Sequence, residues 1–251
     1  MLTEERHQVI LSCLDQNDII TITDLIDPLS ASESTIRRDL QALEDQGLLI
    51  RIHGGAKRAQ TLNFEANMDE KSHKQSGEKQ QIAKYTASLI KPDDVLYLDA
   101  GTTTLRMIPF IPNDFRLKVV TNSVKHASLL VDNQIDTIIL GGAIKLSTNA
   151  TLGTSPMKQL QNYRFNRSFI GMNGIHLDAG YTTPDSEEAA LKRIGILNSR
   201  QSYILADHSK FQQITFTKVA SLDAAKIITD YCPKEFKQKF VSKTTIKEVT
   251  Q

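Results

Sequence analysis

Residues 30–40 constrain the fold of this chain more than any other stretch. They read Ser-Ala-Ser-Glu-Ser-Thr-Ile-Arg-Arg-Asp-Leu. Ser30 and Glu33 match an S-x-x-E capping box, and Ser32 is an alternative N-cap. Either assignment predicts a helix that begins at this point in the chain.

The predicted helix has one apolar and one polar face. Ile36, Leu40 and Leu43 recur at i, i+4 and i+7, which predicts a single buried stripe. The polar side chains off this stripe carry guanidinium, amide and hydroxyl groups that suit base edges and phosphates: Ser34, Thr35, Arg37, Arg38 and Gln41. The pattern fits a DNA-reading helix, and it also fits an ordinary amphipathic surface helix with solvated arginines.

The flanking sequence favours the DNA-reading helix. Residues 3–16 and 23–29 predict two further helices, and Gly47 suits a helix C-cap. Residues 48–52 predict a short strand that runs into a Gly-Gly turn. Three helices and a strand pair describe a winged helix-turn-helix, in which basic side chains of the wing hold flanking phosphates or the minor groove: Arg51, His53, Lys57 and Arg58.

Two spaced motifs in this region resemble a known family. Arg6, Ile10 and Leu14 follow one another at four-residue steps, and Ser32-x-x-Thr35-Ile36-Arg37-Arg38-Asp39-Leu40 lies at a fixed distance behind them. Together they resemble the signature of DeoR-type bacterial transcription regulators. The resemblance implies that the N-terminal region binds operator DNA and that the remainder senses a phosphorylated sugar.

The charge of the first 58 residues refines the DNA-binding hypothesis. They hold six basic and ten acidic side chains, which gives a net charge of −4. Bulk attraction therefore cannot bring this region to DNA, and its cations must be concentrated on one face. Five of the six lie between Arg37 and Arg58. Because one such module has limited reach, we expect a homo-oligomer, a dimer or tetramer, on repeated half-sites of double-stranded DNA.

Composition excludes several other classes of protein. The 251 residues carry a net charge of +1 and no apolar run near the ~18 residues of a membrane span. We expect a cytoplasmic protein with no membrane partner, since the N-terminus lacks a signal-peptide pattern. Cys13 and Cys232 are too few for a thiolate metal site, and the six histidines show no ligand spacing. We therefore expect neither a metal nor a cofactor.

The chain divides into a helix-turn-helix domain over 1–58, a polar linker over 59–77 and an effector-binding domain over 78–251. In the last of these, β-rich runs alternate with helical patterns, which predicts an α/β fold with a Rossmann-like parallel sheet. The predicted strands are 95–98, 117–120, 137–140, 167–170, 202–205 and 226–228. The predicted helices are 78–90, 103–108, 123–131, 155–162 and 186–198.

The loop after the first of these strands has the composition of a phosphate site. Asp99 is followed by Ala100 and then by Gly101, Thr102, Thr103 and Thr104, at the start of a helix. Backbone N–H groups and threonine hydroxyls in this arrangement form an anion cradle. A plain strand-to-helix turn is the alternative. The family resemblance favours phosphate, because such regulators carry a similar D-x-G-T-T segment in a domain related to ribose-5-phosphate isomerase.

Other strand-end residues predict the rim of a sugar site, since ligands bind beyond the carboxyl ends of parallel strands. Each has a structural alternative: a helix cap, a turn, or a surface Glu188–Lys192 pair at i,i+4. The candidates are Asn122, Gly141, Gly142, Glu187, Lys192, Asp207 and Lys210.

Two functions remain open. The first is a repressor that a sugar phosphate releases or tunes at its operator; the resemblance suggests fructose 1-phosphate or tagatose 6-phosphate. The second is a phosphosugar isomerase-like enzyme with Glu187 or Asp99 as base and Lys192 or Lys210 as its cationic partner. An N-terminal helix-turn-helix does not suit a simple enzyme, so we expect no catalysis.

Overall fold

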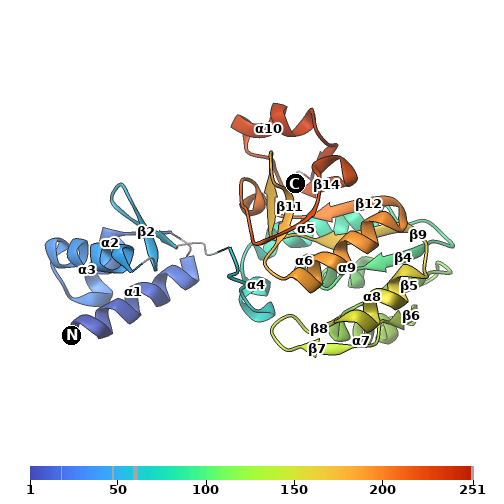
Figure 1. The fold of residues 1–251 in the computed structure, drawn as a ribbon, viewed down its shortest axis with the longest axis horizontal. Helices are drawn as coiled ribbons and strands as arrows, with labels where there is room; N and C mark the ends of the chain where they lie inside the picture. Colours follow the sequence, from blue (N-terminus) through green and yellow to red (C-terminus); the bar gives the residue numbers. More distant parts are fainter. Residues whose placement is uncertain (18, 47, 59–61, 250–251) are drawn as a thin grey trace. The chain divides into compact units, whose positions relative to one another are not determined.

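The computed structural model describes residues 1–17, 19–46, 48–58 and 62–249, in two units, Met1–Thr61 and Leu62–Gln251 (Figure 1). Each unit has its own apolar core.

The first unit is a winged helix-turn-helix, as the sequence predicts. Three short strands form an antiparallel sheet in which β3 lies between β1 and β2. The helices are α1 Thr3–Asn17, α2 Ile22–Leu29 and α3 Glu33–Asp45, and the strands are β1 Ile19–Thr21, β2 Leu49–Ile52 and β3 Gly55–Arg58.

The helix boundaries correct one detail of the sequence analysis. Ser32 is the N-cap of α3, and its side chain accepts a hydrogen bond from the Thr35 N–H. Ser30 instead ends α2, in a left-handed conformation with φ of 46°. The proposed Ser30–Glu33 capping box is therefore wrong, because Ser30 belongs to the preceding turn. The position predicted as a C-cap, Gly47, lies outside the described residues.

The core of the first unit is built from the predicted stripe. Ile36, Leu40 and Leu43 of α3 are each at most 1% exposed and pack with Ile10 and Leu14 of α1. Burying a side chain of this size stabilises a fold by roughly 1.5–3 kcal/mol. This packing orients α3 so that its opposite face is left to solvent.

The second unit is built on a seven-stranded parallel sheet with strand order β15-β14-β12-β9-β4-β5-β6. All six predicted strands are confirmed, and a seventh at the edge, β15, was not predicted. The strands are β4 Val95–Leu98, β5 Lys118–Thr121, β6 Asp136–Ile139, β9 Phe165–Gly171, β12 Ser199–Leu205, β14 Lys226–Thr229 and β15 Ile246–Glu248.

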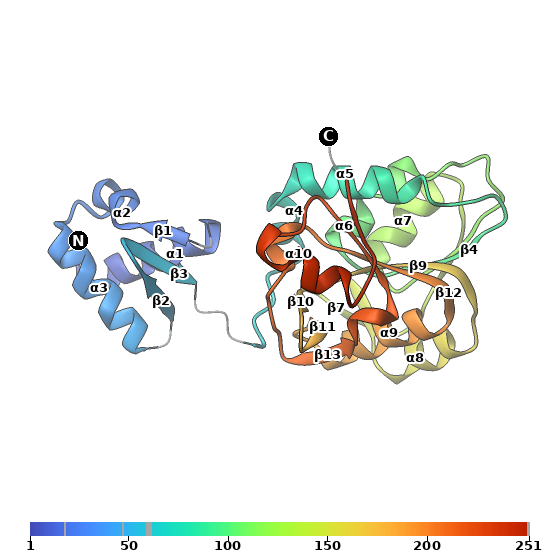
Figure 2. The ribbon, with the colours of Figure 1, turned by 90° about the horizontal axis from the view of Figure 1, so that it is seen from above.

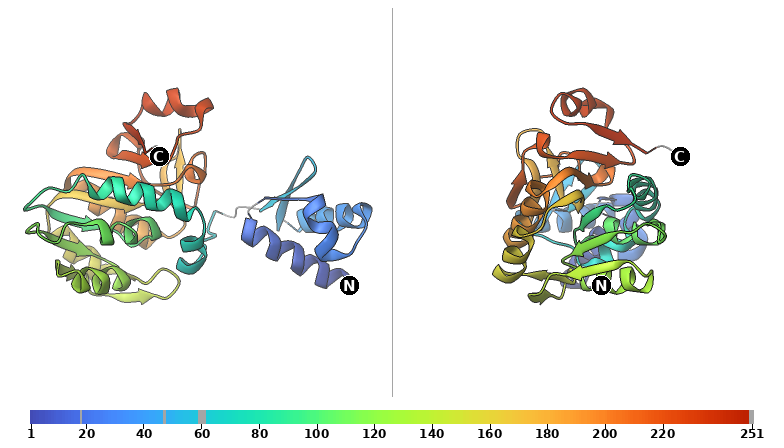
Figure 3. Two further views of the ribbon diagram at one scale, coloured as in Figure 1. Left: turned by 180° about the vertical axis from the view of Figure 1, so that it is seen from behind. Right: turned by 90° about the vertical axis from the view of Figure 1, so that its right-hand side faces the viewer.

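Helices cover both faces of this sheet. On one face lie α5 and α7, and on the other α8 and α9 (Figure 2 and Figure 3). Four of the five predicted helices lie close to their predicted ranges, and α6 is shorter than predicted. The bounds are α5 Ser76–Ala87, α6 Thr102–Leu105, α7 Val124–Asp132, α8 Thr154–Gln161 and α9 Ser186–Leu197, with the unpredicted α4 Met68–His73 and α10 Lys234–Val241.

Smaller elements complete the second unit. A three-stranded antiparallel sheet has the order β10-β11-β13, and β7 pairs with β8. These strands are β10 Gly174–His176, β11 Gly180–Thr183, β13 Thr217–Ala220, β7 Ala143–Lys145 and β8 Ala150–Leu152. Short 3-10 helices span Ile108–Phe110, His208–Lys210 and Leu222–Ala224.

The linker predicted over 59–77 is shorter in the structure. Residues from Leu62 onward belong to the second unit, and Phe216 N donates a 2.9 Å hydrogen bond to Leu62 O. The polar segment holds α4, which periodicity could not reveal because it is only six residues long and is stabilised by contacts distant in sequence.

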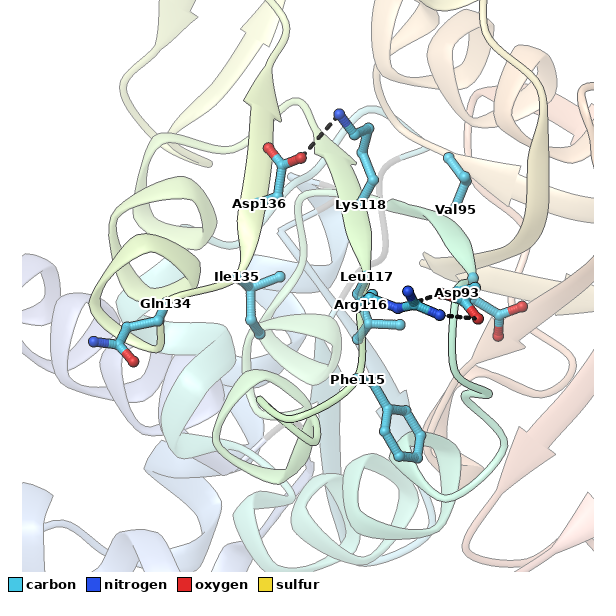
Figure 4. A pocket seen from close by; sticks show the side chains of 10 residues that line it. Asp93, Val95, Phe115, Arg116, Leu117, Lys118, Gln134, Ile135 and Asp136 are labelled. Atoms are coloured by element: carbon cyan, nitrogen blue, oxygen red, sulfur yellow. Dashed lines mark hydrogen bonds and ion pairs between the residues drawn. The ribbon is translucent and has the colours of Figure 1, made fainter.

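A pocket of about 480 Å³ lies at the amino ends of β4, β5 and β6 (Figure 4). Two exposed ion pairs line it: Arg116 Nε lies 3.0 Å from Asp93 Oδ1, and Lys118 Nζ lies 2.8 Å from Asp136 Oδ2. The pocket is thus at the sheet edge opposite to the strand-end loops.

None of the described helices is long and apolar enough to cross a membrane.

Candidate functional site

The outward face of α3 carries the side chains predicted to read DNA. Ser34, Arg37 and Arg38 are exposed, while Thr35 and Gln41 are half-buried. The Ser32 hydroxyl lies 3.0 Å from those of Ser34 and Thr35, so three hydroxyls cluster at the helix N-terminus. DNA contact by these side chains remains a prediction.

Acidic side chains of the same helix hold Arg37 and Gln41. Arg37 Nη2 lies 3.3 Å from Glu33 Oε2, and both side chains are more than half exposed. Gln41 Nε2 donates to Asp45 Oδ1 at 2.8 Å. Exposed pairs of this kind contribute about 0–1 kcal/mol, so a phosphate or base edge can replace them at little cost.

The wing is joined to α3 through Arg51. Its guanidinium donates to Gln41 Oε1, and its backbone N–H donates to Glu44 Oε1 at 2.8 Å. His53 and Lys57 are exposed. Arg58 ends β3, and its side chain lies outside the part of the structure that is described. The structure thus places Arg51 beside the predicted reading helix.

Sequence reasoning missed the ion pair that fixes α3 on α1. Asp39 is 4% exposed, and its carboxylate accepts hydrogen bonds from Arg6 Nε at 2.7 Å and Nη2 at 3.0 Å. His7 Nε2 lies 3.4 Å from the same carboxylate. A signal existed, since Asp39 falls three residues after Ile36 and so on the buried stripe. Arg6 and Asp39 of the family-like motif therefore position the helix.

At the carboxyl edge of the parallel sheet, Asp99 and Lys192 form a buried ion pair. Lys192 Nζ lies 2.6 Å from Asp99 Oδ2, with the two residues 3% and 2% exposed. Burial raises the pKa of Asp99 to about 6 despite the nearby ammonium. Burial alone would lower the pKa of Lys192, but the attraction of Asp99 raises it. Both predicted residues are thus present at one site, as a charged pair.

Of the two adjacent glutamates at the start of α9, Glu188 is buried, whereas Glu187, the candidate of the sequence analysis, is not. Glu188 is 6% exposed and accepts hydrogen bonds from Lys145 Nζ at 3.2 Å and Thr148 Oγ1 at 3.0 Å. Glu187 is exposed on the same helix. The alternative of a surface Glu188–Lys192 pair is wrong, because both side chains are buried with partners on other elements.

Lys145 is the centre of an unpredicted cluster of charges. Its Nζ lies 2.5 Å from Glu65 Oε2 and 2.9 Å from Asp185 Oδ2. Burial alone would lower the pKa of Lys145, but hydrogen bonds to Glu65 and Asp185 raise it above its ordinary value. Glu65 also pairs with Lys71 at 2.7 Å.

In the predicted phosphate loop, the threonines are buried. Thr104 Oγ1 donates to Asp99 O at 2.7 Å or Gly101 O at 2.9 Å and lies 3.0 Å from His126 Nε2. Burial lowers the pKa of His126 to about 3, so its imidazole is neutral. Gly101 has an extended backbone with φ of −174°, and a Cβ there would meet Thr104 Oγ1 at 3.2 Å. Close packing explains the glycine.

The other predicted rim residues have structural partners. Asn122 Oδ1 accepts from Ala100 N at 3.0 Å, which supports the loop after β4. Gly141 exchanges two 3.1 Å hydrogen bonds with Gln159, and a Cβ at Gly142 would come within 2.8 Å of Pro156. The close approach at Gly142 provides a packing reason for that glycine, whereas the backbone bonds of Gly141 do not require one.

Asp207 and Lys210 belong to a second charged cluster. Burial would raise the pKa of Asp207, but the Lys210 ammonium and hydrogen bonds from Ser209 hold it below its usual value. Asp207 also caps the short helix His208–Lys210, so the turn interpretation holds alongside any binding role.

Lys79 is the member of this second cluster that sequence reasoning missed. It is 4% exposed, and its Nζ donates to Lys74 O at 2.6 Å and to Lys71 O. Burial lowers the pKa of Lys79 to about 8, with the charges of Lys210 and Arg106 acting in the same direction. A signal existed here too, because Lys79 lies three residues before the buried Ile82. Among the described residues, no group of histidine, cysteine or carboxylate side chains is arranged to hold a metal ion.

Comparison with known proteins places both units. A profile described as "DeoR-like helix-turn-helix domain" matches residues 6–61, and one described as "DeoR C terminal sensor domain" matches residues 74–231. The "Uncharacterized HTH-type transcriptional regulator FruR" of Bacillus subtilis is 44% identical over 99% of both chains.

A second relative and one solved structure extend this comparison. The lactose phosphotransferase system repressor of Staphylococcus aureus is 30% identical over 94% of this chain and 95% of its own. The ribose 5-phosphate isomerase A structure from Methanocaldococcus jannaschii is similar with a TM-score of 0.40 and 17% identity, over 53% of each chain.

Proposed function

The chain belongs to the DeoR family of transcription regulators, and we propose that it represses a sugar-utilisation operon and leaves the operator when a phosphorylated sugar binds. The observation that carries this proposal is the solvent-facing polar side of α3, held on an apolar core and the Arg6–Asp39 pair. In winged helix-turn-helix proteins the second helix of the motif enters the major groove.

For the DNA contacts, we propose Arg37 and Arg38 as the base- and phosphate-binding cations, with Ser34, Thr35 and Gln41 beside them. Arg51, His53, Lys57 and Arg58 would hold the flanking backbone. Two copies on repeated half-sites would supply the affinity that a module of net charge −4 cannot reach alone.

For the effector, we propose the carboxyl edge of the sheet. The Asp99–Thr104 loop would lie against the ligand. Lys210 and Lys79 would supply positive charge for its phosphate, supported by the surplus of cations around Asp207. Asp99, paired with Lys192, would support that loop from beneath. The family resemblance in the sequence makes fructose 1-phosphate and tagatose 6-phosphate the first ligands to test, and one relative is named as a lactose phosphotransferase system repressor.

We propose no catalytic activity, in keeping with relatives that are named as transcription regulators. The two carboxylates considered as bases are poorly placed. Asp99 is 2% exposed and bonded to Lys192, and Glu187 faces solvent at the start of α9.

The test is a gel shift on the promoter next to the gene, repeated with fructose 1-phosphate, tagatose 6-phosphate, ribose 5-phosphate and inorganic phosphate. We expect a retarded band that one sugar phosphate abolishes. Calorimetry on the same ligands gives binding independently of DNA. Conversion of ribose 5-phosphate to a ketose would contradict the proposal that the chain is not an enzyme.

A further inference from the structure

The short helix α4 is held at its C-terminal end by two cations from other elements. Arg106, directly after α6, donates from Nη2 to Ser72 O at 2.8 Å and to Ser76 Oγ at 2.9 Å. Lys79 of α5 donates to Lys71 O and Lys74 O. Three backbone carbonyls at the end of one helix therefore depend on two side chains.

Contacts that use neither Lys79 nor Arg106 also anchor α4, and one of them holds Lys71 in its last turn. Glu65 precedes the helix and pairs with Lys71 and Lys145, at 2.7 and 2.5 Å. Met68 N donates to Ser147 O at 2.9 Å. A six-residue helix has little stability of its own, so these contacts must supply most of what keeps α4 in place.

The two cations at the C-terminal end are also connected to the predicted effector site, Arg106 through the chain and Lys79 through its charge. Arg106 follows the Thr102–Thr104 turn, and Lys79 lies close enough to Asp207 and Lys210 for their charges to act on it. The Lys210 and Lys79 ammonium groups both act on Asp207, so an anion bound there would meet two cations. A phosphate adds the attraction of a full negative charge to the hydrogen bonds that a cation donates, whereas the α4 carbonyls carry no net charge. A bound phosphate therefore competes with α4 for both cations.

We propose that α4 is a strap that Lys79 and Arg106 hold closed, and that a phosphorylated effector opens it by drawing both cations from the α4 carbonyls. The part so loosened, residues 71–74, belongs to the segment that follows the DNA-binding unit in the chain. This inference rests on the proposed function and specifies how its effector site is connected to the operator-binding unit.

The first test is amide hydrogen exchange on the full chain, with and without inorganic phosphate or fructose 1-phosphate at constant ionic strength. We expect amides of residues 71–74 to exchange at least about fivefold faster with ligand, while those of 102–106 exchange more slowly. Ligands usually slow exchange wherever they bind, so the opposite sign at α4 is diagnostic. Slower or unchanged exchange at residues 71–74 would overturn the strap.

The second test is Glu65→Gln, which weakens the other anchor of α4 without altering Lys79 or Arg106. If opening of α4 is linked to the binding of both operator and phosphate, the variant should bind operator at least about fivefold more weakly. It should bind phosphate more tightly by a similar factor, because such coupling is reciprocal. Asp69→Asn is the matched control: it removes one carboxylate from α4, but that side chain is 88% exposed. It should change neither affinity.

The outcomes separate this inference from the proposed function. Loss of both affinities in Glu65→Gln would mean a merely structural anchor and would overturn the strap. A wild-type chain that responds to sugar phosphates on DNA, with α4 exchange unchanged, overturns the strap and leaves the function standing. A wild-type chain that binds no operator overturns both.

Discussion

The two candidate sites place their charged side chains in opposite environments. On α3 the Arg37 side chain is 53% exposed and pairs with a neighbouring glutamate. At the sheet edge the Lys192 side chain is 4% exposed and lies 2.6 Å from a buried carboxylate. The first arrangement leaves its charge available to a partner, and the second uses its charge to fix a loop. Removing a charged side chain from this chain can therefore change the stability little or greatly, depending on whether that side chain is exposed or buried.

The largest effect is expected from Lys192→Met. It removes the partner of Asp99 from a site that is 2% exposed, and breaking a buried pair in this way costs about 3–5 kcal/mol. Burial raises the pKa of Asp99 to about 6 even beside the ammonium, and loss of the ammonium raises it further, so acid protonates the orphaned carboxyl and reduces the loss. Urea unfolding followed by circular dichroism at pH 7.5 and 5 measures both effects.

The double variant Asp99→Asn/Lys192→Met is the control for that experiment. It should recover much of the stability, since neither charge remains buried alone. A single variant as stable as the wild type at pH 7.5 would show that this pair is not the buried constraint described above.

Next in size is Arg37→Ala on the exposed side of the comparison. A bidentate base contact discriminates by about 1–3 kcal/mol, so we expect operator affinity to fall about 5- to 150-fold while thermal stability hardly changes. Fluorescence anisotropy with operator and scrambled duplexes measures both affinities. Equal losses on the two duplexes would assign Arg37 to a phosphate contact instead of a base.

A smaller effect is expected from pH on the sensing unit. Burial lowers the pKa of Lys79 to about 8, so this side chain loses its proton as the pH rises through 8. The phosphate group of fructose 1-phosphate is already dianionic there, since the second pKa of a phosphate monoester is about 6. We therefore expect affinity for fructose 1-phosphate to fall up to about tenfold between pH 7 and 9, by calorimetry. Lys79→Gln should bind weakly at every pH, and a wild type that shows no fall would exclude Lys79 from the site.

The smallest effect is expected from Arg116→Ala, in the pocket at the amino ends of the strands. Its side chain is 87% exposed, and exposed pairs contribute about 0.2–1 kcal/mol. We expect no change in DNA or phosphate binding and a shift in unfolding midpoint near the limit of measurement. A clear loss of DNA or phosphate binding would instead assign a functional role to the amino ends of the strands.

The sequence analysis succeeded where the signal for an element was local in the sequence. Apolar periodicity located α3 and its stripe, and each of the six predicted strands contains at least two consecutive apolar residues, so both could be predicted. β15 could not, because Ile246–Glu248 offers one apolar residue followed by two charged ones.

Ion pairs between residues distant in sequence could not be predicted. Glu188 and Lys192 are one helical turn apart and suggest a local pair, but Lys192 bonds Asp99, 93 positions away. Sequence spacing reports only neighbours on the same element, whereas the sheet edge is assembled from several strands. Lys79 was missed for a different reason: its place on the buried face of a helix is visible in the sequence, but lysine is rarely buried.

The strand order also has a consequence during synthesis of the chain. The first unit is finished by residue 61, while the middle of the sheet needs β9, which pairs with both β4 and β12. A nascent or prematurely stopped chain therefore contains the whole first unit before the sheet of the second unit can form. Because we expect operator binding to need two copies of that unit, such a shortened product should bind the operator weakly and should not respond to the proposed effector.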